Sequence, residues 1–529
     1  MSGTNEARSE QTAGPGAGAV AGLASAGAAL GIAAAVHTVV PSIPFPPVAV
    51  AQAVIRGAPG GLDAFFITNL QHAARPAAVI GAGVGFLVVA TLLGLFLPRL
   101  RRALGGRTEA AAVVLAAPLY VVAAVTFRPS TGDVGRFPYA LALLPIFGAA
   151  VWVGVLAFRR VALGPADGDV DVARREVVRA MWVGGAGFLL GWANVGRAVF
   201  RRPDPGNTKL TVRGPVSPAP IPSEAPGDAS FARLTSAGAL SPEITPNGRF
   251  YTVNEELFPP DVDPDTWRLE IGGLVDRPFR LTYRQLTAMP AVEQYMTLEC
   301  ISNKIGGDLI STAKWTGVPL PHLLRRAGVQ PGALEVVSRS VDGFSDSIPL
   351  EDAMRPTTLI AFGMNGTMLP RAHGFPARIL VPGYYGMKQP KWLGSVEVVD
   401  RPFRGYWEQR GWIKEAVVKT MSRIDSPRPG TVGGPVTVAG IAFAGDRGIS
   451  RVEVSVDGGR SFTDAEVRTA LSEFTWRQWR YRFIPRPGTV AILVRATDGA
   501  GRTQTSAVTP PEYSGATGLD GVEVVDQSG

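Results

Sequence analysis

The chain has 529 residues, of which 46% are hydrophobic, and its formal net charge is +8. This length predicts several domains. A single cysteine excludes an internal disulfide and a cysteine-rich zinc or iron–sulfur site. The basic residues form no stripe interleaved with aromatic residues, so no nucleic-acid partner is expected.

Residues 1–202 are rich in alanine, valine, leucine and glycine, and they predict an all-α membrane region. A helix that crosses a bilayer needs about 20 apolar residues. Five stretches meet this requirement: 17–40, 76–98, 109–127, 138–158 and 178–200. The first lies too far inside the chain, and is too closely followed by others, to be a simple cleaved signal.

Arginines in the loops predict the orientation of these spans. They are concentrated after the second and fourth spans: Arg99, Arg101, Arg102, Arg107, Arg159, Arg160, Arg174, Arg175 and Arg179. The positive-inside rule then places the N-terminus in the cytoplasm and the residues after the fifth span outside the cytoplasmic membrane. The pair Arg174-Arg175 also resembles an internal twin-arginine export signal, with an ordinary basic loop as the alternative.

Histidines raise the question of a haem in the membrane region. A b-type haem would need paired histidine ligands inside the bundle, and His37 and His72 lie near the first and second spans. Isolated histidines at the membrane interface are more common, and we favour that interpretation. Apart from His37 the spans hold almost no ionisable residue, which argues against a transport path.

The remainder of the chain predicts a linker and two soluble domains. Residues 203–244 begin with a run rich in proline, glycine and serine, which is typical of a linker. Residues 245–413 predict an α+β domain, with a strand in 266–275 and a helix in 319–328 that ends at a glycine cap. Two further predictions cover the C-terminal part. Residues 414–510 predict strands alone, as in an immunoglobulin-like β-sandwich, and residues 511–529 a disordered tail.

Cys300 is the strongest candidate for chemistry. The commonest interpretation of a lone cysteine is a buried small hydrophobic residue. Here its neighbours are polar and glycine-rich, and the ammonium of Lys304 would favour a thiolate. A thiolate is a natural ligand for a soft or highly oxidised metal. A cysteine protease would need His322 or His373 as its base, and no motif supports that.

A second cluster lies in residues 364–394. Its basic and aromatic side chains stand among glycines and prolines: Arg371, His373, Arg378, Lys388, Lys391 and Trp392. Glycine permits close backbone approach, and the basic groups suit an anion that carries phosphate. The alternative is a solvated basic loop, which the aromatic and proline content disfavours.

Several motifs resemble a known family. TLECISN, AKWTGVPL, NGTMLPRAHGFPARILVPGYYGMKQPKWLG and RGYW resemble the molybdopterin domain of the sulfite oxidase family, which includes plant nitrate reductase and the periplasmic methionine-sulfoxide reductase. GIAFAGDRGISRVEVSVDGGRSF and VRATDGAGRTQ resemble that family's dimerisation domain. The resemblance covers about 245–510 and implies a molybdenum–molybdopterin oxidoreductase that transfers an oxygen atom.

The resemblance also implies roles for individual residues. Cys300 would supply the thiolate to molybdenum, and Lys304 could bind the substrate. The remaining matches would hold the pterin and its phosphate: Tyr251, Asn254, Glu255, Arg339, His373, Arg378, Gln389, Pro390 and Lys391. At the Arg339 position the register leaves Ser338 and Ser340 as alternatives.

Two departures leave the substrate open. Ile305 stands where sulfite oxidases have an arginine for the oxyanion, and Phe362 stands where a tyrosine is expected. Without a fixed cation, sulfite loses charge-assisted contacts, so a sulfoxide or another small oxo-compound becomes a candidate substrate. A cytochrome or quinone would exchange electrons, and the sandwich implies a homodimer. The alternative function is a membrane-tethered binding or sensor protein that kept the fold and lost the chemistry.

Overall fold

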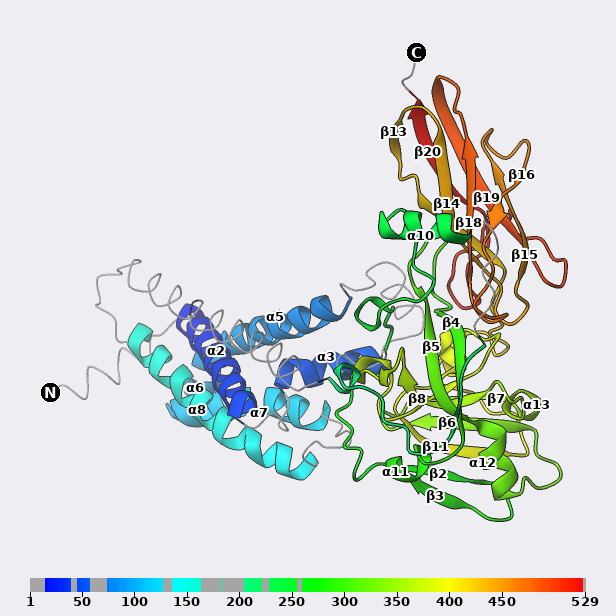
Figure 1. Cartoon of the computed structure of the whole chain (residues 1–529). Coiled ribbons are helices and arrows are strands. Elements are labelled where there is room, and N and C mark those ends of the chain that lie inside the picture. Colours follow the sequence, from blue (N-terminus) through cyan, green and yellow to red (C-terminus); the bar gives the residue numbers. More distant parts are fainter. Residues whose placement is uncertain are drawn as a thin grey trace. The chain divides into compact units, whose positions relative to one another are not determined.

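The structure is a computed structural model of the chain, and it describes residues 15–39, 45–57, 74–126, 136–162, 182, 204–220, 228–254 and 259–526. These residues divide into two compact units, which are described separately. The helical unit comprises the described residues before 204, and the β-rich unit comprises those after it (Figure 1).

Helices alone make up the helical unit in its described residues: α2 (Pro15–Val39), α3 (Pro46–Gly57), α5 (Ala74–Gly94), α6 (Leu97–Ala103), α7 (Thr108–Thr126) and α8 (Arg136–Ala162). Of these, α2, α5, α7 and α8 are long and apolar enough to cross a membrane, and they coincide with the first four predicted spans. The predicted fifth span, the Arg174-Arg175 pair and His72 lie outside the described residues. His37 lies in the last turn of α2.

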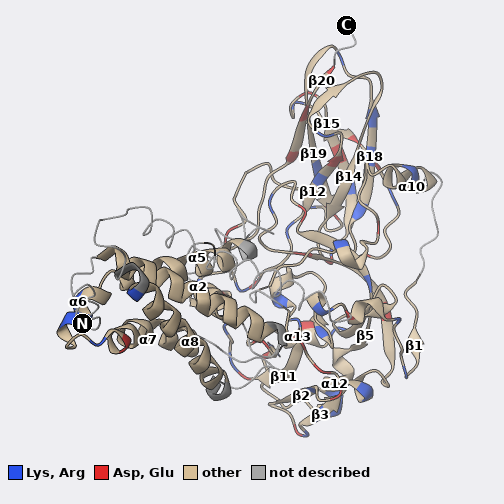
Figure 2. Ribbon diagram, turned by 90° about the vertical axis from the view of Figure 1, so that its left-hand side faces the viewer, with Lys and Arg blue, Asp and Glu red and all other residues tan. Residues whose placement is uncertain are grey.

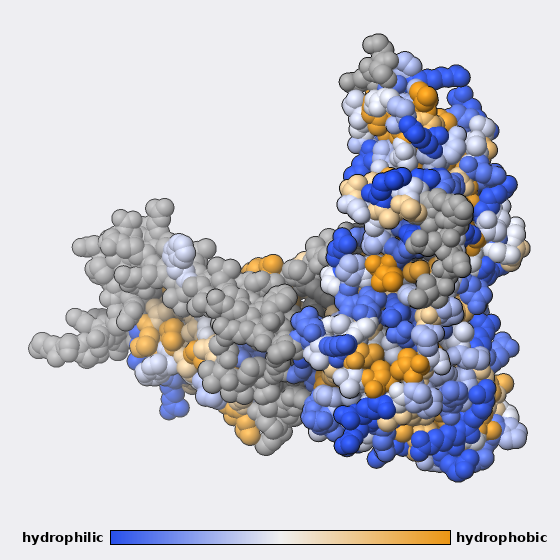
Figure 3. Space-filling model, in the orientation of Figure 1, coloured by the Kyte–Doolittle hydropathy of each residue, from blue (hydrophilic) through white to orange (hydrophobic). Residues whose placement is uncertain are grey.

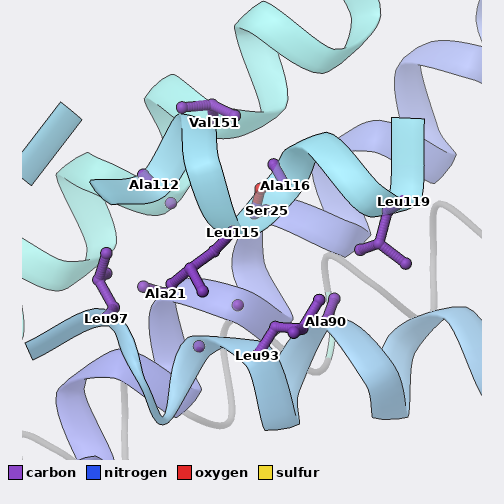
Figure 4. Close-up of a pocket in the computed structure, with 13 residues that line it drawn as sticks. Ala21, Ser25, Ala90, Leu93, Leu97, Ala112, Leu115, Ala116, Leu119 and Val151 are labelled. Carbon is purple, nitrogen blue, oxygen red and sulfur yellow. The ribbon is translucent and has the colours of Figure 1, made fainter. Parts of the chain in front are cut away.

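Small residues let these helices approach closely. A Cβ added to Gly22 of α2 would lie 2.1 Å from the Ala90 carbonyl oxygen of α5, and one added to Gly94 would lie 2.2 Å from the Gly18 carbonyl oxygen. Such contacts are typical of helix packing in membranes. A cavity of about 50 Å³ remains between α2, α5, α7 and α8, lined by residues such as Ser25 and Leu115 (Figure 4). It is too small for an organic cofactor.

The outer surfaces of the long helices are apolar. Val84, Val88 and Leu92 of α5 are each about half exposed, and Figure 3 shows hydrophobic surface on the helical unit. Charged residues are scarce along α2, α5, α7 and α8 and frequent in the β-rich unit (Figure 2). Exposed apolar side chains on long helices suit a lipid environment.

The first domain of the β-rich unit holds two sheets. The larger has the strand order β1-β4-β5-β8-β10, with β9 paired to β8, and the other has the order β3-β2-β11-β6-β7. The strands of the larger sheet are β1 (Val216–Ser217), β4 (Ala291–Glu299), β5 (Ile310–Pro319), β8 (Leu359–Met364), β9 (Thr367–Met368) and β10 (Arg378–Leu380). The strands of the other are β2 (Arg268–Gly273), β3 (Phe279–Thr282), β6 (Glu335–Ser340), β7 (Ser345–Pro349) and β11 (Leu393–Val399).

Short helices complete this domain: α11 (Tyr283–Leu286), α12 (Leu320–Ala327), α13 (Leu350–Ala353) and the 3-10 helices η4 (Arg371–His373), η5 (Gly386–Lys388) and η6 (Glu408–Arg410). One apolar core contains residues of both sheets and of α12, including Leu269, Leu323 and Ile360. Helix α12 ends at Gly328, whose φ of 73° gives the predicted glycine cap. The α+β prediction is confirmed.

The second domain consists of two sheets that share a core. One sheet contains β12 (Met421–Ser426), β14 (Val436–Phe443), β17 (Glu466–Val467) and β18 (Arg477–Phe483). The other contains β13 (Gly430–Val432), β15 (Ile449–Ser455), β16 (Thr463–Asp464), β19 (Gly488–Asp498) and β20 (Asp520–Asp526). Buried Trp479, Val438, Val494 and Val524 fill the space between them. This is the two-sheet arrangement that the sequence predicts, and its immunoglobulin type stays a prediction.

The predicted disordered tail is wrong. Residues 520–526 form β20, which pairs with both β19 and β13. The side chains of Val522 and Val524 are buried. Their alternation with exposed residues is the pattern of a half-buried strand, and the short polar stretch before them concealed it in the sequence.

The predicted linker is also more ordered than its composition indicates. Strand β1 pairs with β4, and Leu210 packs against the core of the first domain. Helix α10 (Asp228–Ser236) buries Phe231 against Ala439 of β14. Composition alone did not indicate this order, because it depends on contacts with other segments. Leu210 packs on the first domain, and Phe231 packs on the second. Residues 221–227 lie outside the described chain.

Candidate functional site

Cys300 follows the last residue of β4 and begins a turn that leads into β5. It is 9% exposed, and its N–H donates to the Leu309 carbonyl (2.9 Å). Asn303 holds the turn together, because its side-chain amide donates to Glu299 Oε1 (3.0 Å) and its amide oxygen accepts from the Leu309 N–H (3.0 Å). The thiol is therefore presented from a fixed turn between two central strands.

Glu299, which precedes the cysteine, is a buried carboxylate that sequence reasoning missed. It is 5% exposed, and its Oε2 has no hydrogen-bond partner among the described residues. Burial raises the pKa of Glu299 to about 7, against the opposing effects of Asn303 and Arg423. The site thus holds a carboxyl group that can carry a proton near neutral pH.

Two tyrosines lie beside this pair. Burial and the nearby Cys300 raise the pKa of Tyr251 well above its usual value. Burial and the nearby Glu299 raise the pKa of Tyr385 in the same way. A Cβ added to Gly386 would lie 2.9 Å from the Tyr251 hydroxyl, so only glycine fits without displacement. Both phenols remain protonated and can donate hydrogen bonds.

Arg378, the first residue of β10, is a buried cation. It is 4% exposed, and its Nη1 and Nη2 donate to the carbonyls of His373 (3.2 Å) and Gln389 (3.3 Å). Its Nε has no partner, and within the described residues it forms no ion pair with a carboxylate. Burial lowers the pKa of Arg378 to about 10. A buried charge left in this state is costly unless an anion approaches it.

Lys391 and Asn254 form the next part of the same basic region. Lys391 Nζ donates to the Val253 carbonyl (2.8 Å) and also bonds the Asn254 side-chain oxygen. The buried Nδ2 of Asn254 has no partner in the described chain. A second orphaned donor therefore accompanies the Arg378 Nε. Glu255, predicted beside them, lies outside the described residues.

His373 is buried and neutral. Its Nε2 lies 3.1 Å from the Asn247 carbonyl, so Nε2 carries the proton in this arrangement. Burial lowers the pKa of His373 to about 4, with Lys391 and Arg378 acting in the same direction. The imidazole therefore adds no charge to the basic region at neutral pH.

Gln389 and Pro390 have a structural role in this region. The Gln389 side chain accepts from the Val381 N–H (3.2 Å) and donates to the Tyr384 carbonyl (2.9 Å). The Pro390 carbonyl accepts from the Ile379 N–H (3.1 Å). These bonds tie the segment 385–391 to the strand that carries Arg378.

Arg339 is not brought to this region. It binds Glu397 (3.1 Å) and its guanidinium lies 4.9 Å from the Phe403 ring. Because side chains alternate along a strand, its neighbours Ser338 and Ser340 point to the opposite face of β6. Both serines are buried, with hydroxyl groups that lack a partner in the described chain. Of the three alternatives at this position, the two buried serines are therefore better placed than Arg339 to bind a ligand, and the contact itself stays a prediction.

Phe362 and Ile305 are the two positions at which the sequence differs from the sulfite oxidase pattern, and the structure places them in different surroundings. Phe362 is fully buried in the core of the first domain, on the face of β8 opposite Ala361, which packs in the cluster beside Tyr251. Phe362 therefore packs as a core residue and brings no hydroxyl group to this position. Ile305 lies in the turn after Cys300, where a Cβ added to Gly518 would meet its Cδ1 at 2.6 Å. The turn thus packs an apolar side chain against the second domain. Lys304 lies in the same turn and is half-buried.

Trp412 is a further residue that sequence reasoning missed. Its ring lies 5.1 Å from that of Trp407 and 5.8 Å from that of Tyr513, between ring centroids. It packs in one cluster with Ile301 and Tyr385, and its buried indole N–H has no partner in the described chain. Nothing in the local sequence distinguishes it from a core tryptophan.

Comparison with known proteins is consistent with this geometry. Residues 256–407 match an oxidoreductase molybdopterin binding domain, and residues 414–510 match a Mo-co oxidoreductase dimerisation domain. Human mitochondrial sulfite oxidase is 33% identical over 321 residues, 50% of this chain and 58% of that protein. The sulfite oxidase of Gallus gallus is 31% identical over 322 residues, 50% of this chain and 69% of that protein.

The chain thus spans 58% of the length of the mammalian relatives that it matches. A solved structure, the sulfane dehydrogenase SoxCD from Paracoccus pantotrophus, aligns with a TM-score of 0.48 at 25% identity, over 54% of this chain and 82% of that one. The two domain matches and the chicken enzyme establish the family. The chain belongs to the sulfite oxidase family of molybdopterin-dependent oxidoreductases.

Proposed function

We propose that the chain is a membrane-anchored molybdenum-cofactor enzyme that transfers an oxygen atom to or from a small substrate. The observation that carries this proposal is the buried Arg378, which in the described part of the chain has an unpartnered Nε and no carboxylate in contact with it. A phosphate would neutralise it through charge-assisted hydrogen bonds.

The residues present fit a molybdenum–pterin group. Cys300 offers a buried sulfur on a fixed turn, as a metal thiolate requires. Arg378, Lys391 and the orphaned Asn254 amide offer donors for a phosphate. The bound group would supply two-electron oxygen-atom transfer chemistry.

The chain's own residues would set the surroundings of that chemistry. The phenols of Tyr251 and Tyr385 stay protonated and can donate to an oxygen atom near Cys300. Glu299 can hold or release a proton close to neutral pH, because burial raises its pKa to about 7. The aromatic cluster that contains Trp407 and Trp412 excludes water from this side.

We propose that the substrate is a small neutral oxo-compound, such as a sulfoxide, in preference to sulfite. The turn after Cys300 carries Ile305 packed against Gly518, so no arginine fork stands there for a doubly charged anion. Lys304 offers only a mobile point charge in the same turn. The relatives named sulfite oxidase therefore support molybdenum-dependent oxygen-atom transfer by this chain, but they do not determine its substrate.

An activity test separates these substrates. Purified full-length protein in detergent is assayed for sulfoxide reduction with a reduced viologen and for sulfite oxidation with ferricyanide. We expect the turnover of sulfoxide reduction to exceed that of sulfite oxidation roughly tenfold or more, and Cys300→Ser to abolish both. Faster sulfite oxidation would refute the substrate proposal. Folded protein without metal would instead favour the tethered binding or sensor protein.

We further propose that the β-rich unit lies outside the cytoplasmic membrane, forms a homodimer through residues 414–510, and exchanges electrons with a quinone or a cytochrome. The basic loops after the second and fourth spans support the orientation, and the matched dimerisation domain supports the dimer. Changing Arg174-Arg175 to Lys-Lys should leave this unit inaccessible to protease added outside. Unchanged accessibility would refute the export signal.

A further inference from the structure

Three charged side chains meet in the interior of the first domain. Lys388 of η5 places its Nζ 2.8 Å from Asp346 Oδ1 and 2.5 Å from Glu408 Oε1. The side chains of Lys388, Asp346 and Glu408 are 2%, 0% and 3% exposed. We call these three residues the lysine triad. They come from η5, β7 and η6, three separate segments of the domain.

The lysine triad is an expensive arrangement. Removing charges from water costs several kcal/mol per ion, and a well-packed apolar cluster would often be as stable. Two carboxylates face one ammonium, and Asp346 Oδ2 has no partner in the described chain. Burial, with the nearby Glu408 carboxylate, raises the pKa of Asp346 despite the opposing effect of Lys388. Stability alone therefore gives a poor account of the triad.

The position of Lys388 in the chain offers a better account. It lies between Tyr385, beside the cysteine, and Lys391, in the basic region. Its own N–H donates to the Tyr385 carbonyl (3.0 Å), and the next residue's carbonyl accepts from Arg378. The Lys388 side chain itself contacts Asp346 and Glu408. The buried ion pairs of its ammonium therefore hold the middle of the segment that runs from Tyr385 to Lys391.

Glu408, another member of the lysine triad, is connected through its neighbour Trp407 to the aromatic cluster that includes Tyr385. Glu408 Oε2 accepts from the Gly405 N–H (3.3 Å), and Glu408 directly follows Trp407. Trp407 packs on Trp412 in the aromatic cluster that includes Tyr385. The triad therefore fixes both the segment 385–391 and the aromatic segment that packs beside it.

We propose that Lys388 is a positioning residue. Held between Asp346 and Glu408, it fixes the segment 385–391 so that Lys391 meets the cofactor phosphate, the Gln389 carbonyl holds Arg378, and Tyr385 stays beside Cys300. This inference rests on the proposed function, since it assigns the segment a ligand. It adds residues that touch neither the metal nor the phosphate.

The test compares one single and one triple variant of the full-length protein. Lys388→Met leaves two buried carboxylates without their cation, so it should lower both thermal stability and molybdenum content. The triple variant Lys388→Met, Asp346→Asn, Glu408→Gln removes all three charges. It should recover most of the stability but still hold molybdenum and pterin at least about tenfold less tightly per folded chain. Lys314→Met, which breaks a half-buried ion pair with Glu293, is the matched control.

The outcomes separate the two proposals. Wild-type protein without molybdenum or pterin would refute the proposed function itself. Loaded wild type together with an equally loaded triple variant would refute only the positioning role. Asp346→Asn is a second test, because it keeps the Lys388–Glu408 pair. It should retain wild-type molybdenum content and slow hydrogen exchange over residues 385–391, and fast exchange there would overturn the anchor.

Discussion

The helical and β-rich units differ in how many charged residues they contain and where those residues lie. Along α2, α5, α7 and α8 charged residues are scarce, and backbones meet through small residues such as Gly22 and Gly94. The buried Arg101 at the end of α6 bonds Thr108 within its own unit (2.8 Å). The β-rich unit instead buries Arg378, whose guanidinium has no carboxylate partner among the described residues. One unit thus packs mainly through apolar contacts, whereas the other buries a cation that an anion would neutralise.

Removing the Arg378 charge should have the largest effect. Arg378→Met takes away the charge-assisted bonds that a phosphate would accept, which contribute about 1.5–3 kcal/mol each. We expect retention of molybdenum and pterin to fall roughly 10- to 100-fold, measured per folded chain after dialysis. The exposed Arg325 of α12 gives the matched control, Arg325→Met. Unchanged content in Arg378→Met would mean that this cation has a structural role only.

The second-largest effect should follow from removing a contact between the two domains of the β-rich unit. Arg423 of β12 donates to the Gly307 carbonyl, to Asp425 and to Ser241, each at 2.8 Å. Arg423→Met should destabilise the β-rich unit by about 2–4 kcal/mol and lower turnover, because it releases the turn that holds Cys300. Thermal unfolding and activity measure both, with the exposed Arg428→Met as control. A stable variant with normal turnover would show that the second domain does not support the site.

In the helical unit, the close approach of helix backbones should affect stability more than the helix propensity of the substituted residue does. Gly22→Ala would place a Cβ 2.1 Å from the Ala90 carbonyl oxygen, whereas the Cβ of Gly85→Ala has open space around it. Overpacking costs about 1–3 kcal/mol. We therefore expect Gly22→Ala to lower the melting temperature in detergent while Gly85→Ala leaves it unchanged or raises it. Equal melting temperatures would contradict the close approach of α2 and α5.

The remaining prediction concerns pH. Burial lowers the pKa of His373 from 6.5 to about 4. The stability from keeping it neutral is present above pH 6.5 and is lost as the pH falls through about 4. Protein prepared without cofactor should lose up to about 1.4 kcal/mol per pH unit in that window. His373→Gln should flatten this slope, and the exposed His322→Gln should not. An equal slope in both variants would refute the assignment.

The sequence predicted the parts of the molecule that rest on local pattern. Four apolar stretches became four long helices, the 319–328 helix ended at Gly328, and Cys300, Tyr251, Arg378 and Lys391 fell in one region. These features depend on hydrophobic period, on a glycine cap and on a dense motif. All three can be seen within one segment of the chain.

The remaining features depend on contacts between distant segments. Composition gave no sign that residues 520–526 would complete a sheet, or that Phe231 would pack on Ala439. The lysine triad joins residues 346, 388 and 408, and Arg339 faces away because of the strand alternation of β6. Burial and partners across the sheet decide such cases, and neither can be read from a single window of sequence.

The most direct test of the central claim is the molybdenum and pterin content of the purified full-length chain, made in a host that supplies the cofactor. We predict about one molybdenum and one pterin per chain, with Cys300→Ser folding normally and losing all turnover. Folded wild-type protein that contains neither molybdenum nor pterin would contradict the account.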